Sequence, residues 1–148
     1  MKKVNIFLDS SALIAGIISE IGAAHVLLQL GETQDIVLMV SELVIEETIR
    51  SVARKSPENL EDVQTEIKKA RINIHPDPSD EEIQANLYLI DDRDDVPVLL
   101  AAMKAKVDYL ATHDRKHFLD NPKAAEKAGI KIGTPSDVLA WIRENLNS

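Results

Sequence analysis

Residues 4–14 of the chain read VNIFLDSSALI, and this stretch decides which fold the sequence predicts. Its first part, Val4–Leu8, is a short apolar run that ends at Asp9-Ser10-Ser11. Runs of this length are typical of strands that are buried on both faces, as in a parallel sheet. Beyond the polar residues, apolar side chains recur at three- and four-residue spacing over Ala12–Ile18, which predicts a helix. The chain therefore opens with a predicted strand, a polar turn and a helix.

The same alternation continues along the rest of the chain. Ile36–Val40 and Tyr109–Ala111 predict two further strands, and Ile72–Ile74 and Ile130–Ile132 are weaker strand candidates. Helical patterns occupy Ala23–Leu30, Leu43–Arg54, Pro57–Ala70, Asp80–Leu89, Val96–Lys106 and Ser136–Leu146. Strands that alternate with helices imply a mostly parallel sheet covered on both faces. We therefore expect an α/β protein, a three-layer α/β/α fold with a mostly parallel four- or five-stranded sheet, in a single domain over residues 1–148.

Composition limits the chemistry that the chain can perform. It has 148 residues, of which 45% are hydrophobic, and no cysteine. Neither a disulfide framework nor a thiolate metal site is therefore possible, and any metal must be held mainly by oxygen atoms. No uncharged apolar run approaches the roughly 20 residues of a membrane span, and the basic start of the chain has no long apolar segment after it. We expect a cytoplasmic protein with no membrane partner.

The net charge of −8 argues against broad, nonspecific nucleic-acid binding, because such binding comes mainly from Lys and Arg. It does not exclude a nuclease, since a cation bound by clustered carboxylates cancels part of their charge and local basic groups can still contact a phosphate backbone. The candidates for such contacts are Arg50, Arg54, Lys55, Lys68, Lys69, Arg71, Arg115 and Lys116. The alternative is that each of them lies on a solvated helix face.

Two acidic residues follow predicted strands. Asp9 comes directly after Leu8, and Asp114 closes the segment Ala111-Thr112-His113-Asp114 after the third predicted strand. In an open parallel sheet, ligands bind beyond the carboxyl ends of the strands, so both carboxylates should lie over the same edge of the sheet. Taken alone, either residue has a simpler explanation as the N-cap of the next helix.

Glu47 lies at the edge of the inward-facing stripe of the helix predicted over Leu43–Arg54, whereas Glu46 turns toward Arg50, four residues on. An exposed ion pair is enough to explain Glu46. A carboxylate that points inward needs a partner, so we favour Glu47 over Glu46 as a site residue. The alternative is that both are solvated and that the helix is tilted.

Four aspartates crowd the segment Asp91-Asp92-Arg93-Asp94-Asp95, immediately before a predicted helix whose first turn carries Pro97. One of them serves as a helix cap, but the others repel one another unless water, Arg93 or a cation relieves the charge. The excess of acids indicates a metal role for a residue of this segment, with capping and helix-dipole effects as the alternative.

In this order and at these distances, the segments resemble the PIN domain, the fold of many ribonuclease toxins in bacterial and archaeal toxin–antitoxin pairs. The resemblance spans nearly the whole chain. Its motifs are Phe7–Ile14 with the first acid, Asp9; Ser41 followed six residues later by Glu47; Asp92–Leu99, where the spacing to Val98-Leu99 selects Asp95; Asp108–Asp114, which resembles a strand that ends in Thr-x-Asp; and Gly133–Leu139, which resembles one branch of these toxins.

Two residues depart from the family pattern, and the assignment of one acid has an alternative. Ser10 stands where Thr is usual, which preserves the hydroxyl, and His113 stands where Gly, Asn or Arg is more usual. Asp94 and Asp95 would exchange roles if the helix began one residue earlier.

The resemblance implies a metal-dependent endoribonuclease that uses Mg²⁺ or Mn²⁺, ions that hard oxygen ligands suit. Asp9 and Asp114 would bind the metal directly, and Asp95 directly or through water. Glu47 would orient the attacking water or hold a second ion. Supporting roles would fall to Ser11, Thr112 and Asp94, of which the two hydroxyls would donate hydrogen bonds that fix the carboxylates. An RNA substrate, an antitoxin partner and a homodimer are also implied.

Three alternative functions have to be weighed. An aspartyl-phosphate phosphatase also places an Asp after its first strand, but it needs a second Asp two residues later, where this chain has Ser11. A phospho-receiver domain needs paired acids after the first strand, and only Asp9 is present there. The third alternative is a PIN fold without catalytic activity that serves as a binding module.

Overall fold

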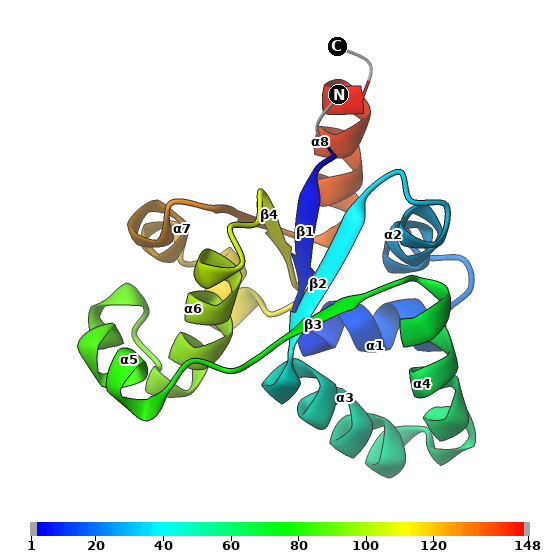
Figure 1. Cartoon of the computed structure of the whole chain (residues 1–148), viewed down its shortest axis with the longest axis horizontal. Helices are drawn as coiled ribbons and strands as arrows, with labels where there is room; N and C mark the ends of the chain where they lie inside the picture. The colour runs from blue at the N-terminus through cyan, green and yellow to red at the C-terminus, as the bar shows by residue number, and fades with distance from the viewer. Residues whose placement is uncertain (1–2, 147–148) are drawn as a thin grey trace.

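The computed structural model describes residues 3–146, with the side chain of the last residue excepted, so residues 1–2 and 147–148 of the expected domain lie outside it. Five parallel strands form one sheet in the order β3-β2-β1-β4-β5 (Figure 1). The strands are β1 (Asn5–Leu8), β2 (Val37–Ser41), β3 (Asn73–His75), β4 (Tyr109–Ala111) and β5 (Lys131–Gly133). The predicted α/β class and parallel sheet are confirmed, and both weaker strand candidates form edge strands.

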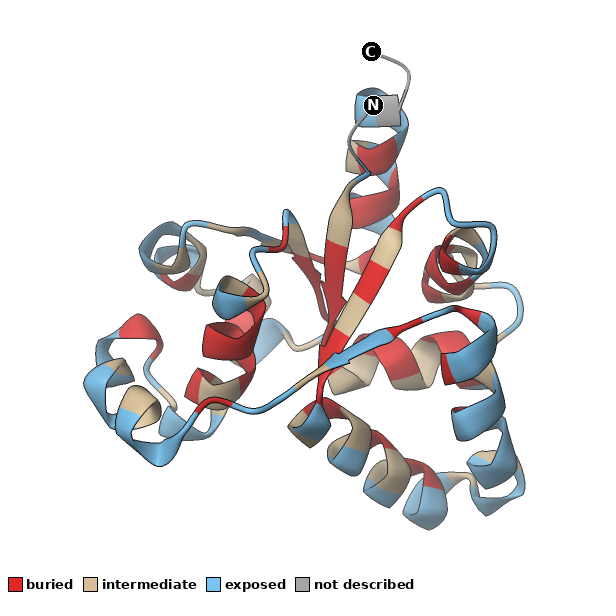
Figure 2. Ribbon diagram, in the orientation of Figure 1, coloured by how far each residue is buried: buried red, intermediate tan, exposed pale blue. Residues whose placement is uncertain are grey.

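The central strands owe their position to the apolar runs that predicted them. Phe7 of β1 pairs with Met39 of β2 on one side and with Leu110 of β4 on the other. Phe7 and Leu110 are fully buried, and Figure 2 shows the buried residues concentrated along these strands and on the helix faces turned toward them. Because both faces of the sheet are covered, consecutive residues such as Ile6, Phe7 and Leu8 are apolar instead of alternating with polar ones.

The helices cover the two faces of this sheet. They are α1 (Ser10–Ile18), α2 (Ala23–Glu32), α3 (Glu42–Lys55), α4 (Leu60–Lys69), α5 (Asp80–Ala85), α6 (Val96–Lys104), α7 (Pro122–Ala128) and α8 (Pro135–Leu146). One face is covered by α6 with α5 and α7 beside it, and the other by α1, α2 and α8 (Figure 1). Helices α3 and α4 pack on α1, and α3 also contacts α6. The beginning of α3 therefore lies where the two helical layers meet, next to the carboxyl end of β2.

Two predicted helices are interrupted in the structure. The segment predicted as one helix over Pro57–Ala70 begins with a 3₁₀ turn, η1 (Pro57–Asn59), before α4. The segment over Asp80–Leu89 divides into α5 and the 3₁₀ turn η2 (Leu87–Leu89). The break falls at Asn86, whose side-chain amide donates to the carbonyl oxygen of Glu82. Asparagine competes in this way with the backbone and so favours helix ends.

The structure between β4 and β5 was not predicted from the sequence. A single π-helical turn, η4 (Arg115–Leu119), follows β4 and leads into α7. Only one residue of α7, Ala124, is buried. A helix with so little buried surface has no apolar stripe in its sequence, which is why periodicity did not reveal it.

The strand order argues against the phospho-receiver domain, one of the alternative functions. A receiver fold has the order 2-1-3-4-5, which differs from the order found here.

Within residues 3–146, no single helix is long and apolar enough to cross a membrane, and α1 and α2, which pass that test together, are bent by 87°.

Candidate metal centre

Asp9 lies at the carboxyl end of β1, where it is buried and caps α1. Its Oδ1 accepts a hydrogen bond of 2.8 Å from the backbone N–H of Ser10. Its Oδ2 accepts one of 2.8 Å from the Thr112 hydroxyl and a longer one of 3.4 Å from the Ser11 hydroxyl. Burial, together with the nearby Asp114 carboxylate, raises the pKa of Asp9 in spite of these hydrogen bonds. The hydrogen bonds thus fix the position of the Asp9 carboxylate, although burial makes its ionised form less favourable than it is in water.

Ser11 and Thr112 connect the first strand to the fourth. The Thr112 hydroxyl, which donates to Asp9, accepts a hydrogen bond of 3.0 Å from the backbone N–H of Asp114. The Ser11 hydroxyl accepts one of 2.9 Å from the backbone N–H of His113. The two hydroxyls thereby fix the segment after β4 against the segment after β1, and with it the relative positions of Asp9 and Asp114.

Asp114 caps the π-helical turn and binds His117 through both of its oxygens. Its Oδ1 accepts from the backbone N–H of His117 at 3.1 Å, and its Oδ2 lies 2.9 Å from the ring Nδ1 of the same residue. This contact is the largest cause of the raised pKa of His117. Sequence reasoning did not identify His117, which the turn folds back onto the site.

The acidic segment before α6 forms a 3₁₀ turn, η3 (Arg93–Asp95), that Asp92 caps by accepting from the backbone N–H of Asp94 at 2.9 Å. Its members face different surroundings. The Asp95 side chain is only 17% exposed and its Oδ2 lies 3.6 Å from Nδ1 of His117, whereas Asp94 is exposed and lies beside Pro97 of α6. This geometry favours Asp95 over Asp94 as the acid of this segment that belongs to the site.

Glu47 on α3 is half-buried and close enough to Asp9 and Asp95 for both carboxylates to raise its pKa, after burial as the largest cause. Its neighbour Glu46 is exposed and forms the expected ion pair with Arg50, at 3.5 Å. The inward direction of Glu47 and the outward direction of Glu46 are therefore as the helix periodicity predicted.

The electrostatic surroundings of these carboxylates suit a cation. Burial raises the pKa of Asp95 to about 6, and the charges of Asp92, Asp114 and Asp9 add to the effect, although His117 opposes it. Asp95 Oδ2 is inaccessible to solvent and has no hydrogen-bond partner among the described residues. Neighbouring carboxylates that repel one another, and an oxygen without a donor such as Asp95 Oδ2, are the kind of ligands that a hard divalent cation satisfies. The chemistry of these residues therefore fits a hard divalent cation.

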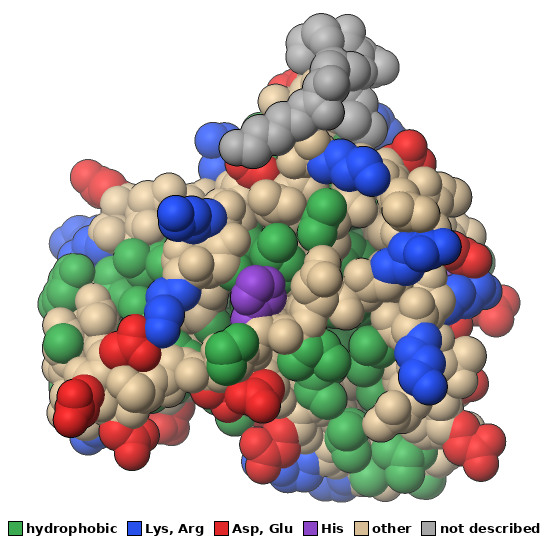
Figure 3. All heavy atoms as spheres, in the orientation of Figure 1, with side chains coloured by type: hydrophobic (Ala, Val, Ile, Leu, Met, Phe, Trp, Pro, Cys, Tyr) green, Lys and Arg blue, Asp and Glu red, His purple; other side chains and the backbone are tan. Residues whose placement is uncertain are grey.

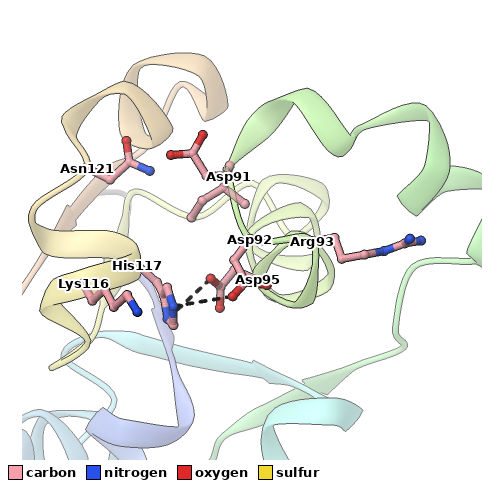
Figure 4. Close-up of a pocket in the computed structure, with 8 residues that line it drawn as sticks. Asp91, Asp92, Arg93, Asp95, Lys116, His117 and Asn121 are labelled. Carbon is pink, nitrogen blue, oxygen red and sulfur yellow. Dashed lines mark ion pairs between the residues drawn. The ribbon is translucent and has the colours of Figure 1, made fainter.

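Residues of the site line two open grooves. One, of about 600 Å³, is lined by Asp92, Asp95, His117 and residues around them (Figure 4). The other, of about 570 Å³, runs between α1 and α3 and is lined by Ser10, Ser11, Ile14, Ile18, Glu47, Arg50, Ser51, Arg54 and Lys55. On the face drawn in Figure 3, acidic side chains gather over α5 and the beginning of α3, and basic side chains are spread around the margin.

The protein therefore has a three-layer α/β fold with a cluster of acidic residues at the carboxyl edge of its parallel sheet. The sequence profile of the PIN domain matches residues 5–116, well over half of the chain. The chain belongs to the PIN domain family. Comparison with curated protein sequences gives no significant match.

Solved structures share this fold at low sequence identity. PAE2754 from Pyrobaculum aerophilum is 17% identical and superposes with a TM-score of 0.61 over 95% of this chain and 96% of its own. VapBC2 from Rickettsia felis, bound to a DNA fragment from its promoter, is 17% identical and superposes with a TM-score of 0.62 over 88% of this chain and 98% of its own. VapC20 from Mycobacterium tuberculosis, a toxin that cleaves the sarcin–ricin loop, is 17% identical and superposes with a TM-score of 0.53 over 75% of this chain and 91% of its own.

Proposed function

We propose that this PIN domain is a metal-dependent endoribonuclease that hydrolyses phosphodiester bonds of RNA, acts as a single catalytic domain and is the toxin of a toxin–antitoxin pair. The observation that carries the proposal is the group of four carboxylates, Asp9, Glu47, Asp95 and Asp114, at the carboxyl edge of the sheet. Their mutual repulsion is unfavourable in the metal-free protein. Carboxylates that are held close together at a surface groove, in spite of their electrostatic repulsion, are typical of a functional site.

Asp9, Asp95 and Asp114 would hold Mg²⁺ or Mn²⁺. When bound, the cation supplies positive charge over the scissile phosphate and promotes ionisation of the attacking water. The hydroxyls of Ser11 and Thr112 keep the Asp9 carboxylate in a fixed orientation. Glu47, which is half-buried and has a raised pKa, would orient the attacking water and accept its proton at a carboxylate oxygen.

The groove between α1 and α3 would hold the RNA backbone. Arg50, Arg54 and Lys55 line it and are exposed, and it begins at Ser10 and Glu47 next to the carboxylates. These cations would bind phosphates in a chain whose net charge is otherwise −8. They would place an adjacent phosphodiester over the metal centre.

The likeness in fold to VapBC2 and VapC20 supports the toxin role. VapBC2 is bound to a DNA fragment from its promoter, and VapC20 is a toxin that cleaves the sarcin–ricin loop. We accordingly propose an antitoxin partner, a homodimer and a cytoplasmic location for this chain.

The test is cleavage of a mixed pool of RNA by the purified protein in the presence of Mn²⁺, Mg²⁺ or EDTA. We expect cleavage with either cation and none with EDTA. The Asp9→Asn and Asp95→Asn variants should lose activity by about a hundredfold or more, because the charge that holds the cation is removed. Asp94→Asn is the matched control, since Asp94 is exposed, and it should retain most of the activity.

Cleavage by the purified protein that survives both EDTA and Asp9→Asn would contradict the proposal, because it would require neither a cation nor the Asp9 carboxylate. Binding of RNA without cleavage under any condition would favour the alternative, a PIN fold that serves as a binding module.

A further inference from the structure

The groove of about 600 Å³ between η3 and η4 is not used by the proposed reaction, apart from Asp95 (Figure 4). This η3–η4 groove shares Asp95 with the metal centre, whereas the groove between α1 and α3 shares Glu47. In the sheet, β1 lies between β2, which α3 follows, and β4, which η4 follows, so the two grooves open on different sides of Asp9. An RNA strand whose scissile phosphate lies at the centre can therefore extend into both.

The charges that line the η3–η4 groove do not suit a phosphate. Asp91 and Asp92 line it in addition to Asp95, with Lys116 on the opposite side. Arg93 borders the groove as well, but Figure 4 shows its side chain directed away from it. The groove between α1 and α3 has the opposite character, since three cations and one carboxylate line it. A neutral part of the RNA, which is a base, therefore fits the η3–η4 groove better than a second phosphate does.

Asn121 lines the same groove with a side chain that the fold does not use. It occupies the N-cap position of α7, where asparagine usually accepts a hydrogen bond, but its side chain makes no such bond. Among residues 3–146 its half-buried amide has no hydrogen-bond partner. Figure 4 shows this amide turned toward Asp91, whose exposed carboxylate also bonds none of the described residues. An amide and a carboxylate that face each other without partners are available to a ligand.

We propose that the η3–η4 groove binds one base of the RNA beside the scissile phosphate and selects guanine through Asp91 and Asn121. The Asp91 carboxylate would accept hydrogen bonds from the N1–H and amino N–H groups of guanine, which lie side by side. The amide N–H of Asn121 would donate to the neighbouring O6. This inference rests on the proposed function only in that the base belongs to an RNA substrate, and it is tested without cleavage.

The other bases match this pair of side chains less well. Adenine and cytosine present one amino group beside a ring nitrogen with a lone pair, and that lone pair would face the Asp91 carboxylate. Uracil has one N–H group between two carbonyl oxygens, so an oxygen would face the carboxylate. An ionised carboxylate only accepts hydrogen bonds, so each of these bases sets one acceptor against another. A matched pair of hydrogen bonds to a base should favour guanine by at least about fivefold in affinity.

The experiment is a titration of the ¹⁵N-labelled full chain with 5′-GMP, 5′-IMP or 5′-AMP in EDTA, followed by NMR. The three nucleotides carry the same phosphate, so differences among them report on the base, and IMP lacks only the amino group of GMP. We expect GMP to shift the side-chain amide signals of Asn121 and to bind at least about fivefold more tightly than AMP, with IMP between them. Asp91→Asn should abolish this preference. Asn121→Asp, which keeps the size of the side chain and is equally suited to an N-cap, should abolish it as well.

Two control variants separate the possible causes. Asp94→Asn removes a neighbouring exposed carboxylate that lines a different groove, and it should keep the preference for GMP. Asp9→Asn should keep the preference while cleavage is lost, so failure of the proposed nuclease is distinguishable from failure of this base site. Equal binding of GMP and AMP, shifts confined to the groove between α1 and α3, or a preference that survives Asp91→Asn would each overturn the base site.

Discussion

The charge of Asp95 should destabilise the metal-free protein, and replacing this residue by asparagine should relieve that cost. Asp95 has a pKa of about 6 in the folded protein and a reference value of 3.8. The folded state therefore binds more protons than the unfolded state between these values, so stability is lost as the pH rises from about 4 to about 6. Asparagine keeps the shape of the side chain and removes the charge.

The magnitude follows from the two pKa values. Near pH 7.5 the ionised carboxylate costs on the order of 3 kcal/mol of folding free energy, and near pH 4 it costs less than about 1 kcal/mol. Asp95→Asn should therefore raise the free energy of unfolding by at most about 3 kcal/mol near pH 7.5, with the gain falling below about 1 kcal/mol near pH 4. Loss of the contact with His117, which favours the ionised form, makes the upper figure a ceiling.

Urea unfolding followed by circular dichroism, in EDTA and at both pH values, measures this difference. Asp94→Asn is the control, because its side chain is exposed, and it should change stability by less than about 0.5 kcal/mol. Equal stability of Asp95→Asn and the unmodified protein near pH 7.5, or a gain that does not shrink at lower pH, would refute the electrostatic reasoning. Saturating Mn²⁺ should reverse the order, because the cation stabilises only the protein that binds it well.

Three further predictions concern hydrogen bonds and packing in the site and elsewhere in the fold. Thr112→Val removes the hydroxyl that lies between Asp9 and the backbone of Asp114. It should lower the free energy of unfolding in urea by about 1 to 3 kcal/mol and raise the pKa of Asp9 further, as measured by NMR titration. An unchanged pKa of Asp9 would contradict the role of that hydrogen bond. Gly31→Ala places a Cβ 2.6 Å from the carbonyl oxygen of Ala70 and should lower the melting temperature, whereas an unchanged value would show that α2 can move away. Ser79→Ala breaks the capping box of α5 and should cost about 1 kcal/mol in urea unfolding, without an effect on Mn²⁺ affinity.

The fold could be predicted from the sequence because the central strands and the long helices are buried. The strand segment Ile36–Val40 carries an unbroken apolar run, and α3 has a distinct inward face, so that Glu47 is half-buried while Glu46 is exposed. The segment after β4 lacked this signal, since α7 buries little apolar surface. Its helical structure depends on Asn121 and Pro122 at the start and on Gly129 in a left-handed conformation at the end, which are local signals without periodicity.

The part of the site formed by His117 and Asp92 was missed for a related reason. His117 reaches the carboxylates through a π-helical turn, a rare conformation that no hydrophobic period reveals. A local signal was nevertheless present. In Asp114-Arg115-Lys116-His117 an acid precedes a histidine by three residues, the spacing at which a helix cap and the side chain of the first turn bind each other. Asp92 was treated as part of an excess of acids, whereas it is the cap of η3 and also faces His117.

For Asp9 and Asp114, capping a helix and belonging to the site are not alternatives. Asp9 caps α1 with Oδ1 and turns Oδ2 to the hydroxyls of Thr112 and Ser11, and Asp114 caps η4 with Oδ1 and turns Oδ2 to His117. A carboxylate has two oxygen atoms, so one residue can terminate a helix and still belong to the site. This determines which substitution is informative. Asparagine keeps one oxygen for the cap while removing the charge, whereas alanine at either position would combine the loss of a cap, about 1 kcal/mol, with the loss of a cation ligand.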